Sequence, residues 1–235
     1  MIIAATSDIL SPRYYGEFIS ALDRLQVRPD IFLIAGDMVY RADVAEFEKV
    51  SNALFGKIQC PIVACFGNNE FQEIREDVKQ KYKSIRFLDD QSIVIDVGRE
   101  SIGVFGSTGA LDTPTSWQKQ NVPNIENIFK MRYDMADKHL HRMHATFRIL
   151  MTHYAPTHKT LEGENPRFVS NLGAKYWENL IVSIKPNLVL HGHNHHGLKM
   201  AWVDTVPVMN VALPLNKEIV VIDTQKIKPG LAQFV

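Results

Sequence analysis

Short apolar runs that alternate with amphipathic segments constrain the fold of this chain more than any other feature of its sequence. The runs at 2–6, 31–35 and 61–66 are almost entirely apolar. The segments between them, 14–27 and 44–55, carry apolar residues at helical spacing. Strands that are apolar on both faces are typical of a parallel sheet covered by helices. The first part of the sequence therefore predicts an α/β fold.

The middle of the chain has a different pattern. Three closely spaced runs with strand character, 85–88, 92–97 and 102–105, are separated by turn residues and resemble an antiparallel meander. The stretch 107–124 is rich in Ser, Thr, Pro and Asn, contains Trp117, and predicts a long loop. Loops of that length in compact domains are often functional lids, so Trp117 is as consistent with a cap over a substrate as with a packed loop aromatic.

The last part of the chain returns to the first pattern. A helix is predicted at 125–144, and strands at 147–152 and 187–190 flank another helix at 171–184. Two α/β halves with antiparallel strands near each predict two sheets packed face to face, with helices outside. No linker or internal repeat interrupts the chain, so we expect one domain over residues 1–235.

Composition and charge narrow the class of protein. Lys and Arg total 26 and Asp and Glu total 26, so the chain has no net charge with which to bind long nucleic acid. No apolar run approaches the ~18 residues of a membrane helix, and the N-terminus lacks signal-peptide features. Cys60 and Cys65 belong to one predicted strand, which disfavours a disulfide. We expect a complete cytoplasmic protein without membrane insertion.

Side chains that bind metals follow the predicted strand ends directly. They comprise two carboxylates, one amide and three imidazoles: Asp8, Asp37, Asn68, His153, His193 and His195. The carboxyl ends of parallel strands form the rim where α/β sheets bind ligands. Gly36, Gly67 and Gly192 each precede one of these side chains and predict sharp strand exits. A set without thiolate suits a pair of divalent ions such as Mn²⁺, Fe²⁺, Zn²⁺ or Ni²⁺.

Each of these residues alone has an ordinary explanation. A single Asp at a strand end is more often a helix N-cap, and a single His more often hydrogen-bonds to the backbone. Their combination in this order favours a metal site.

The order of the motifs resembles the calcineurin-like metallophosphoesterase superfamily. That family carries Asp-x-His, Gly-Asp, Gly-Asn-His-Asp/Glu, His and Gly-His-x-His in sequence. This chain has Gly36-Asp37 and Gly192-His193-Asn194-His195 in full, and the resemblance runs from residue 8 to residue 195. It implies a four-layer α/β/β/α sandwich.

The resemblance also implies roles. Asp8 and His195 would bind a first ion, and Asp37 would bridge both ions. An amide and two imidazoles would complete the second site: Asn68, His153 and His193. A metal-bound hydroxide would attack the phosphorus of a small phosphorylated substrate. The residues implied in catalysis are Asp37, Asn68, Asn69 and His153.

Two positions depart from the family pattern. Leu10 stands where the family has the His of Asp-x-His, so the first ion loses a ligand and should bind more weakly. Asn69 stands where the family has the His that assists the leaving group, and an amide cannot supply a proton. General acid help is worth ~10²–10⁴-fold, so phosphodiesters are expected over monoesters. His158 or His191 could substitute as the proton donor.

Two functions follow from these observations. The first is a metal-dependent phosphodiesterase or phosphatase. The second is a degenerate phosphoesterase fold that serves as a non-catalytic binding scaffold, as Leu10 and Asn69 would allow. Retention of the six ligand positions favours the enzyme. The sequence makes no prediction of the specific substrate or of oligomeric state.

Overall fold

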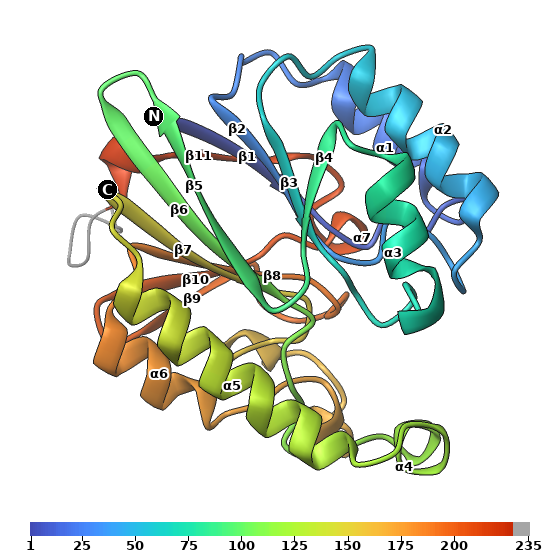
Figure 1. Ribbon diagram of the computed structural model, residues 1–235, viewed down its shortest axis with the longest axis vertical. Helices are drawn as coiled ribbons and strands as arrows, with labels where there is room; N and C mark the ends of the chain where they lie inside the picture. Colours follow the sequence, from blue (N-terminus) through green and yellow to red (C-terminus); the bar gives the residue numbers. More distant parts are fainter. Residues whose placement is uncertain (228–235) are drawn as a thin grey trace.

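The computed structural model describes residues 1–227, and two β-sheets form its centre (Figure 1). The first sheet has the strand order β11-β1-β2-β3-β4. Strands β1 to β4 are mutually parallel, and β11 pairs antiparallel with β1. Its strands are β1 (Ile2–Thr6), β2 (Ile31–Ala35), β3 (Ile62–Cys65), β4 (Ile85–Leu88) and β11 (Val220–Asp223).

The second sheet has the order β5-β6-β7-β8-β10-β9. Its four central strands are parallel, and β5 and β9 pair antiparallel at the two edges. Its strands are β5 (Gln91–Val97), β6 (Glu100–Ser107), β7 (Phe147–Thr152), β8 (Leu188–His191), β9 (Met200–Val203) and β10 (Val206–Asn210).

Helices cover the outer face of each sheet (Figure 1). The first sheet is covered by α1 (Tyr15–Asp23), α2 (Val44–Phe55) and α3 (Gln72–Lys81), and the second by α5 (Ile125–Arg142) and α6 (Trp177–Ile184). Two short helices, α4 (Ser116–Asn121) and α7 (Leu213–Asn216), lie in connecting segments. The predicted four-layer α/β/β/α sandwich is confirmed.

Alternation along β2 explains why the strands are apolar throughout. Leu33 faces the second sheet, in a cluster that fills the space between the two sheets. Phe32 and Ile34 point the other way and pack under the helices. Because both faces of β2 are buried, every position needs an apolar side chain. The same arrangement puts the carboxyl ends of the parallel strands at one edge of the molecule.

The predicted meander is wrong at its first strand. β4 pairs parallel with β3 in the first sheet, whereas β5 pairs antiparallel with β6 in the second. Asp89 and Asp90 separate β4 from β5, and Asp90 has a positive φ of 56°. So short a connection is typical of a hairpin. Here it carries the chain from one sheet to the other.

Three helices of the described residues were not predicted from the sequence: α3, α4 and the four-residue α7. Helix α3 is mostly polar and buries only Arg75 and Val78, so its apolar face is too narrow to show a helical period. Helix α4 lies inside the predicted long loop and begins with a capping box formed by Thr115 and Gln118. In the described part of the chain, no helix combines the length and apolar character needed to cross a bilayer. That residues 1–235 form a single domain stays a prediction.

Candidate metal centre

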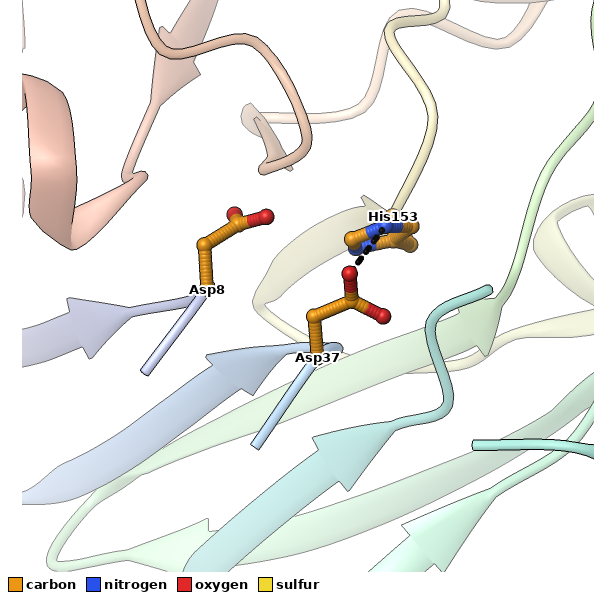
Figure 2. A group of neighbouring side chains, drawn as sticks. All are labelled: Asp8, Asp37 and His153. Atoms are coloured by element: carbon orange, nitrogen blue, oxygen red, sulfur yellow. Dashed lines mark ion pairs between the residues drawn. The ribbon is translucent and has the colours of Figure 1, made fainter. Parts of the chain in front are cut away.

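Three side chains from separate strand ends converge at the edge where the parallel strands finish. Asp8 follows β1 and Asp37 follows β2, and both carboxylates point toward the ring of His153, which follows β7 (Figure 2). All three residues are buried. One ligand atom from each lies within 4.8 Å of the others, a spacing that a bound metal ion requires.

Asn68 and Asn69 place two further polar groups around Asp37. The backbone N–H of Asn69 donates to Asp37 Oδ1 at 2.8 Å, and its side-chain Nδ2 donates to Asp37 Oδ2 at 2.6 Å. His153 Nε2 lies 3.4 Å from Asp37 Oδ2 and 2.9 Å from Asn68 Oδ1. Asn69 thus fixes the orientation of the Asp37 carboxylate rather than lying free at the position of a proton donor.

The hydrogen bond on the far side of His153 decides which ring nitrogen is available. Nδ1 lies 2.9 Å from the carbonyl oxygen of Ala35, which can only accept, so we assign the proton to Nδ1. In that tautomer Nε2 presents a lone pair to Asp37 and Asn68. Three acceptor atoms facing one another repel unless a cation lies between them. A backbone carbonyl behind a ligating imidazole is also the usual support for a metal ligand.

The carboxylate of Asp8 connects the first strand to the histidine loop that follows β8. Its Oδ2 accepts hydrogen bonds from Ser7 Oγ at 2.6 Å and from the backbone N–H of His193 at 2.8 Å. Its Oδ1 lies 3.2 Å from His195 Nε2. The rings of His153 and His193 are 5.0 Å apart. All six predicted ligand residues therefore contact at least one other member of the set.

The two buried carboxylates are electrostatically unfavourable together. Burial and the neighbouring charge of Asp8 raise the pKa of Asp37. Burial also opposes ionisation of Asp8, but its hydrogen bonds with His195 and Ser7 lower the pKa of Asp8 overall. The pair thus resists a second negative charge, which a divalent cation would offset. The donor set and its charge fit the metal that the motifs imply.

Some histidines near the site have rings that could bind a metal, whereas others are already paired with other side chains. Burial lowers the pKa of His193 to about 3, so its ring is neutral and able to ligate. Burial opposes protonation of His195, but the hydrogen bond to Asp8 raises its pKa. The two alternative proton donors are engaged elsewhere: His191 is buried with Nε2 2.9 Å from Thr160 Oγ1, and His158 pairs with Asp112 at 2.7 Å.

Backbone conformation at the ligands explains the glycines beside them. Asp8, Asp37 and His193 have φ values of 56°, 54° and 68°, a region that few non-glycine residues occupy. Such conformations cost ~1–3 kcal/mol each and cluster at functional sites. A Cβ on Gly67 or on Gly192 would collide with the carboxylate of Asp37 or of Asp8, respectively. At both glycines the backbone therefore passes too close to a carboxylate to leave room for a side chain.

Two buried charged residues support the loops but were not assigned a role from the sequence. The carboxylate of Glu70 accepts from the backbone N–H groups of Asp37 at 2.9 Å, Gly67 at 2.7 Å and Val39 at 3.2 Å. Burial and the charge of Asp37 raise the pKa of Glu70 to about 7. Arg75 donates to the carbonyls of Glu70 and Gly67 and pairs with Asp89 at 2.6 Å. The acid directly after Gly67-Asn68-Asn69 was the available signal for Glu70.

Several solved structures are similar to this chain in fold. Phosphopantetheinyl hydrolase from Mycobacterium tuberculosis has a TM-score of 0.68 at 13% identity, covering 97% of this chain and 98% of that one. TT1561 of Thermus thermophilus has a TM-score of 0.61 at 17% identity, with coverage of 97% and 96%. GAP50, described as the anchor in the inner membrane complex of Plasmodium, has a TM-score of 0.60 at 11% identity, with coverage of 91% and 72%.

Sequence comparison identifies the family directly. Among curated proteins, none matches this chain. The family model described as calcineurin-like phosphoesterase matches residues 1–197, which include every predicted ligand. The chain therefore belongs to the calcineurin-like phosphoesterase family.

Proposed function

We propose that this protein is a metal-dependent phosphodiesterase with two divalent ions at the strand ends. One observation carries the proposal: Asp37 Oδ2, His153 Nε2 and Asn68 Oδ1 are acceptors that face one another beside a second buried carboxylate, Asp8. Such a site favours cations and offers no thiolate, as expected of a catalytic centre rather than a structural zinc site. Free thiols at Cys60 and Cys65 agree with a cytoplasmic location.

The proposed roles of the residues combine the family motifs with the contacts of each side chain. When bound, two divalent ions supply a hydroxide nucleophile and positive charge beside the phosphoryl oxygens. Asp8 and His195 would hold one ion, Asp37 would serve both ions, and the remaining ligands would complete the other site: Asn68, His153 and His193. Asn69 keeps the Asp37 carboxylate oriented through two hydrogen bonds. The leaving group receives no proton from Asn69, which favours esters whose alcohols leave readily.

The first test compares two chromogenic esters with added Mn²⁺. We expect a higher kcat/KM for bis-p-nitrophenyl phosphate than for p-nitrophenyl phosphate, because a diester carries less negative charge than a monoester next to Asp8 and Asp37. Treatment with a chelator should abolish turnover, and Mn²⁺ should restore it. No turnover of either ester with Mn²⁺, Fe²⁺, Zn²⁺ or Ni²⁺ would contradict the proposed function.

The weaker first ion site gives a second prediction. Leu10 is buried with a positive φ of 44° and occupies the position of a family ligand. Leu10→His should raise the affinity for the second Mn²⁺ equivalent by at least about tenfold, since groups that merely support metal ligands already change affinity 10–100-fold. Titration calorimetry of metal-free protein would measure this. Identical binding curves for the variant and the wild type would contradict an incomplete first site.

The alternative is a binding scaffold on the same fold. The ligand replaced by Leu10 favours it, and the similar GAP50 is described as an anchor. Metal analysis of the purified protein separates the two functions. A scaffold predicts less than one tightly bound ion, with no change in Asp37→Ala, whereas the enzyme predicts bound ions that this substitution removes.

A further inference from the structure

Two exposed aromatic rings, those of Phe71 and Trp117, stack on each other beside the metal centre. Phe71 directly precedes α3, and Trp117 belongs to α4, which precedes α5 on the other side of the fold (Figure 1). Their ring centroids are 6.2 Å apart, with 22° between the ring planes. Phe71 is 38% exposed and Trp117 is 57% exposed. Among the described residues, no other stacked aromatic pair has both rings exposed.

A buried hydrogen bond fixes Trp117 relative to the metal ligands. Its neighbour Gln118 caps α4 together with Thr115 and donates from Nε2 to the hydroxyl of Tyr154 at 3.0 Å. Tyr154 is buried, and its ring lies 4.8 Å from the ring of His193 in an edge-on arrangement. The backbone at Trp117 is therefore anchored through Gln118 to the residue that follows the candidate ligand His153, while the indole ring itself contacts Phe71.

Phe71 is likewise next in sequence to a buried polar residue that is hydrogen-bonded to the candidate metal centre. It follows Glu70, whose buried carboxylate accepts the backbone N–H groups of Asp37 and Gly67. Asn69, which holds the Asp37 carboxylate, lies two residues before Phe71. Each aromatic residue is thus adjacent in sequence to a buried polar residue tied to the metal centre. Two rings from separate segments of the chain thus stack on each other, each next in sequence to a residue anchored to the loops that carry candidate ligands.

We propose that Phe71 and Trp117 form an aromatic platform that binds the nucleobase of a phosphorylated substrate while its phosphate lies at the metal centre. The proposal rests on the proposed function and adds a substrate class to it. A planar base can stack on exposed ring faces, and such stacking is worth ~1–3 kcal/mol per base.

The test compares two ligands that differ only by the base. Calorimetric titration of the Mn²⁺-loaded full chain with adenosine 5′-monophosphate and with ribose 5-phosphate isolates the contribution of the ring. In the wild type we expect the nucleotide to bind about 5- to 150-fold more tightly, which is the stacking energy converted at 1.4 kcal/mol per tenfold. Trp117→Ala and Phe71→Ala should each reduce this ratio and leave ribose 5-phosphate binding unchanged.

A matched control removes an exposed aromatic side chain elsewhere. Phe55 is 74% exposed at the opposite end of α2 from the metal centre, so Phe55→Ala should retain the full nucleotide preference. Equal affinities in the wild type would overturn the proposal, as would failure of both ligands to bind or a preference that survives both rim variants. If the protein preferred the nucleotide over ribose 5-phosphate but hydrolysed no ester, only the proposed function would be contradicted. If it hydrolysed esters but bound the two ligands equally, only the aromatic platform would be contradicted.

Discussion

Asp37→Asn should reduce the hydrolysis of bis-p-nitrophenyl phosphate by at least about 10³-fold, because metal ions contribute several kcal/mol of charge stabilisation to such reactions. The Asp37 carboxylate lies between Asp8 and His153 and is the proposed bridge between the ions. An amide of the same shape keeps an oxygen for the N–H of Asn69 but removes the negative charge. The loss should therefore appear in kcat and in metal affinity.

In the absence of metal, Asp37→Asn should preserve or increase the thermal stability of the protein, although it impairs hydrolysis when metal is present. Burial and the charge of Asp8 raise the pKa of Asp37 above its ordinary value of 3.8. The unfolded chain therefore ionises this group first, and the metal-free wild type loses stability as pH rises above about 4. Asn cannot ionise, so in chelator the variant should melt at the same temperature as the wild type or higher. This difference should grow from about pH 4 to the raised pKa of Asp37 at about 8, and stay constant above it.

Thermal melts with and without Mn²⁺ give the decisive comparison. Mn²⁺ should raise the Tm of the wild type through binding to the folded state, and should have little effect on Asp37→Asn. Asp77→Asn is the matched control, since Asp77 is exposed on α3 and should alter neither activity nor the Mn²⁺ effect. Turnover by Asp37→Asn near the wild-type rate would refute the bridging role.

Local patterns predicted most of the fold and grouped the candidate ligands correctly. The strand β2 was predicted with its observed bounds because burial on both faces demands an uninterrupted apolar run. Parallel strands necessarily present their carboxyl ends together, so residues as distant in sequence as Asp8 and His195 were expected in one place. The chemistry of the site is thus encoded close to the strand ends.

Features that depend on long-range packing were not predictable in the same way. The two-residue connection after β4 has no local signal that distinguishes a hairpin from a change of sheet. The hydrogen bond from Asn69 to the Asp37 carboxylate likewise depends on two separate loops, and only the folded structure reveals it. The stacking of Phe71 on Trp117 likewise joins separate segments with no shared motif.

Glu70→Ala should lower the free energy of unfolding by about 3–5 kcal/mol, because it leaves three buried backbone N–H groups without an acceptor at ~1–3 kcal/mol each. Relief of the cost of burying the carboxylate offsets part of that sum. The affected groups belong to Val39, Asp37 and Gly67, so both loops that carry candidate ligands should loosen. Urea denaturation in chelator would measure the effect on the fold apart from metal binding.

Two comparison variants identify the cause of that loss. In the wild type the N–H groups of Asp37 and Gly67 both donate to Oε2 of Glu70. Glu70→Gln keeps one acceptor oxygen that can serve both groups, so Gln should destabilise the fold clearly less than Ala does. Glu73→Ala removes an exposed carboxylate from the first turn of α3 and should cost less than about 1 kcal/mol. If Ala, Gln and the control were equally stable, the loops would be held by something other than this carboxylate. If the ranking holds, the metal centre depends on an acid that binds no metal, because it fixes the backbone from which Asp37 and Asn68 project.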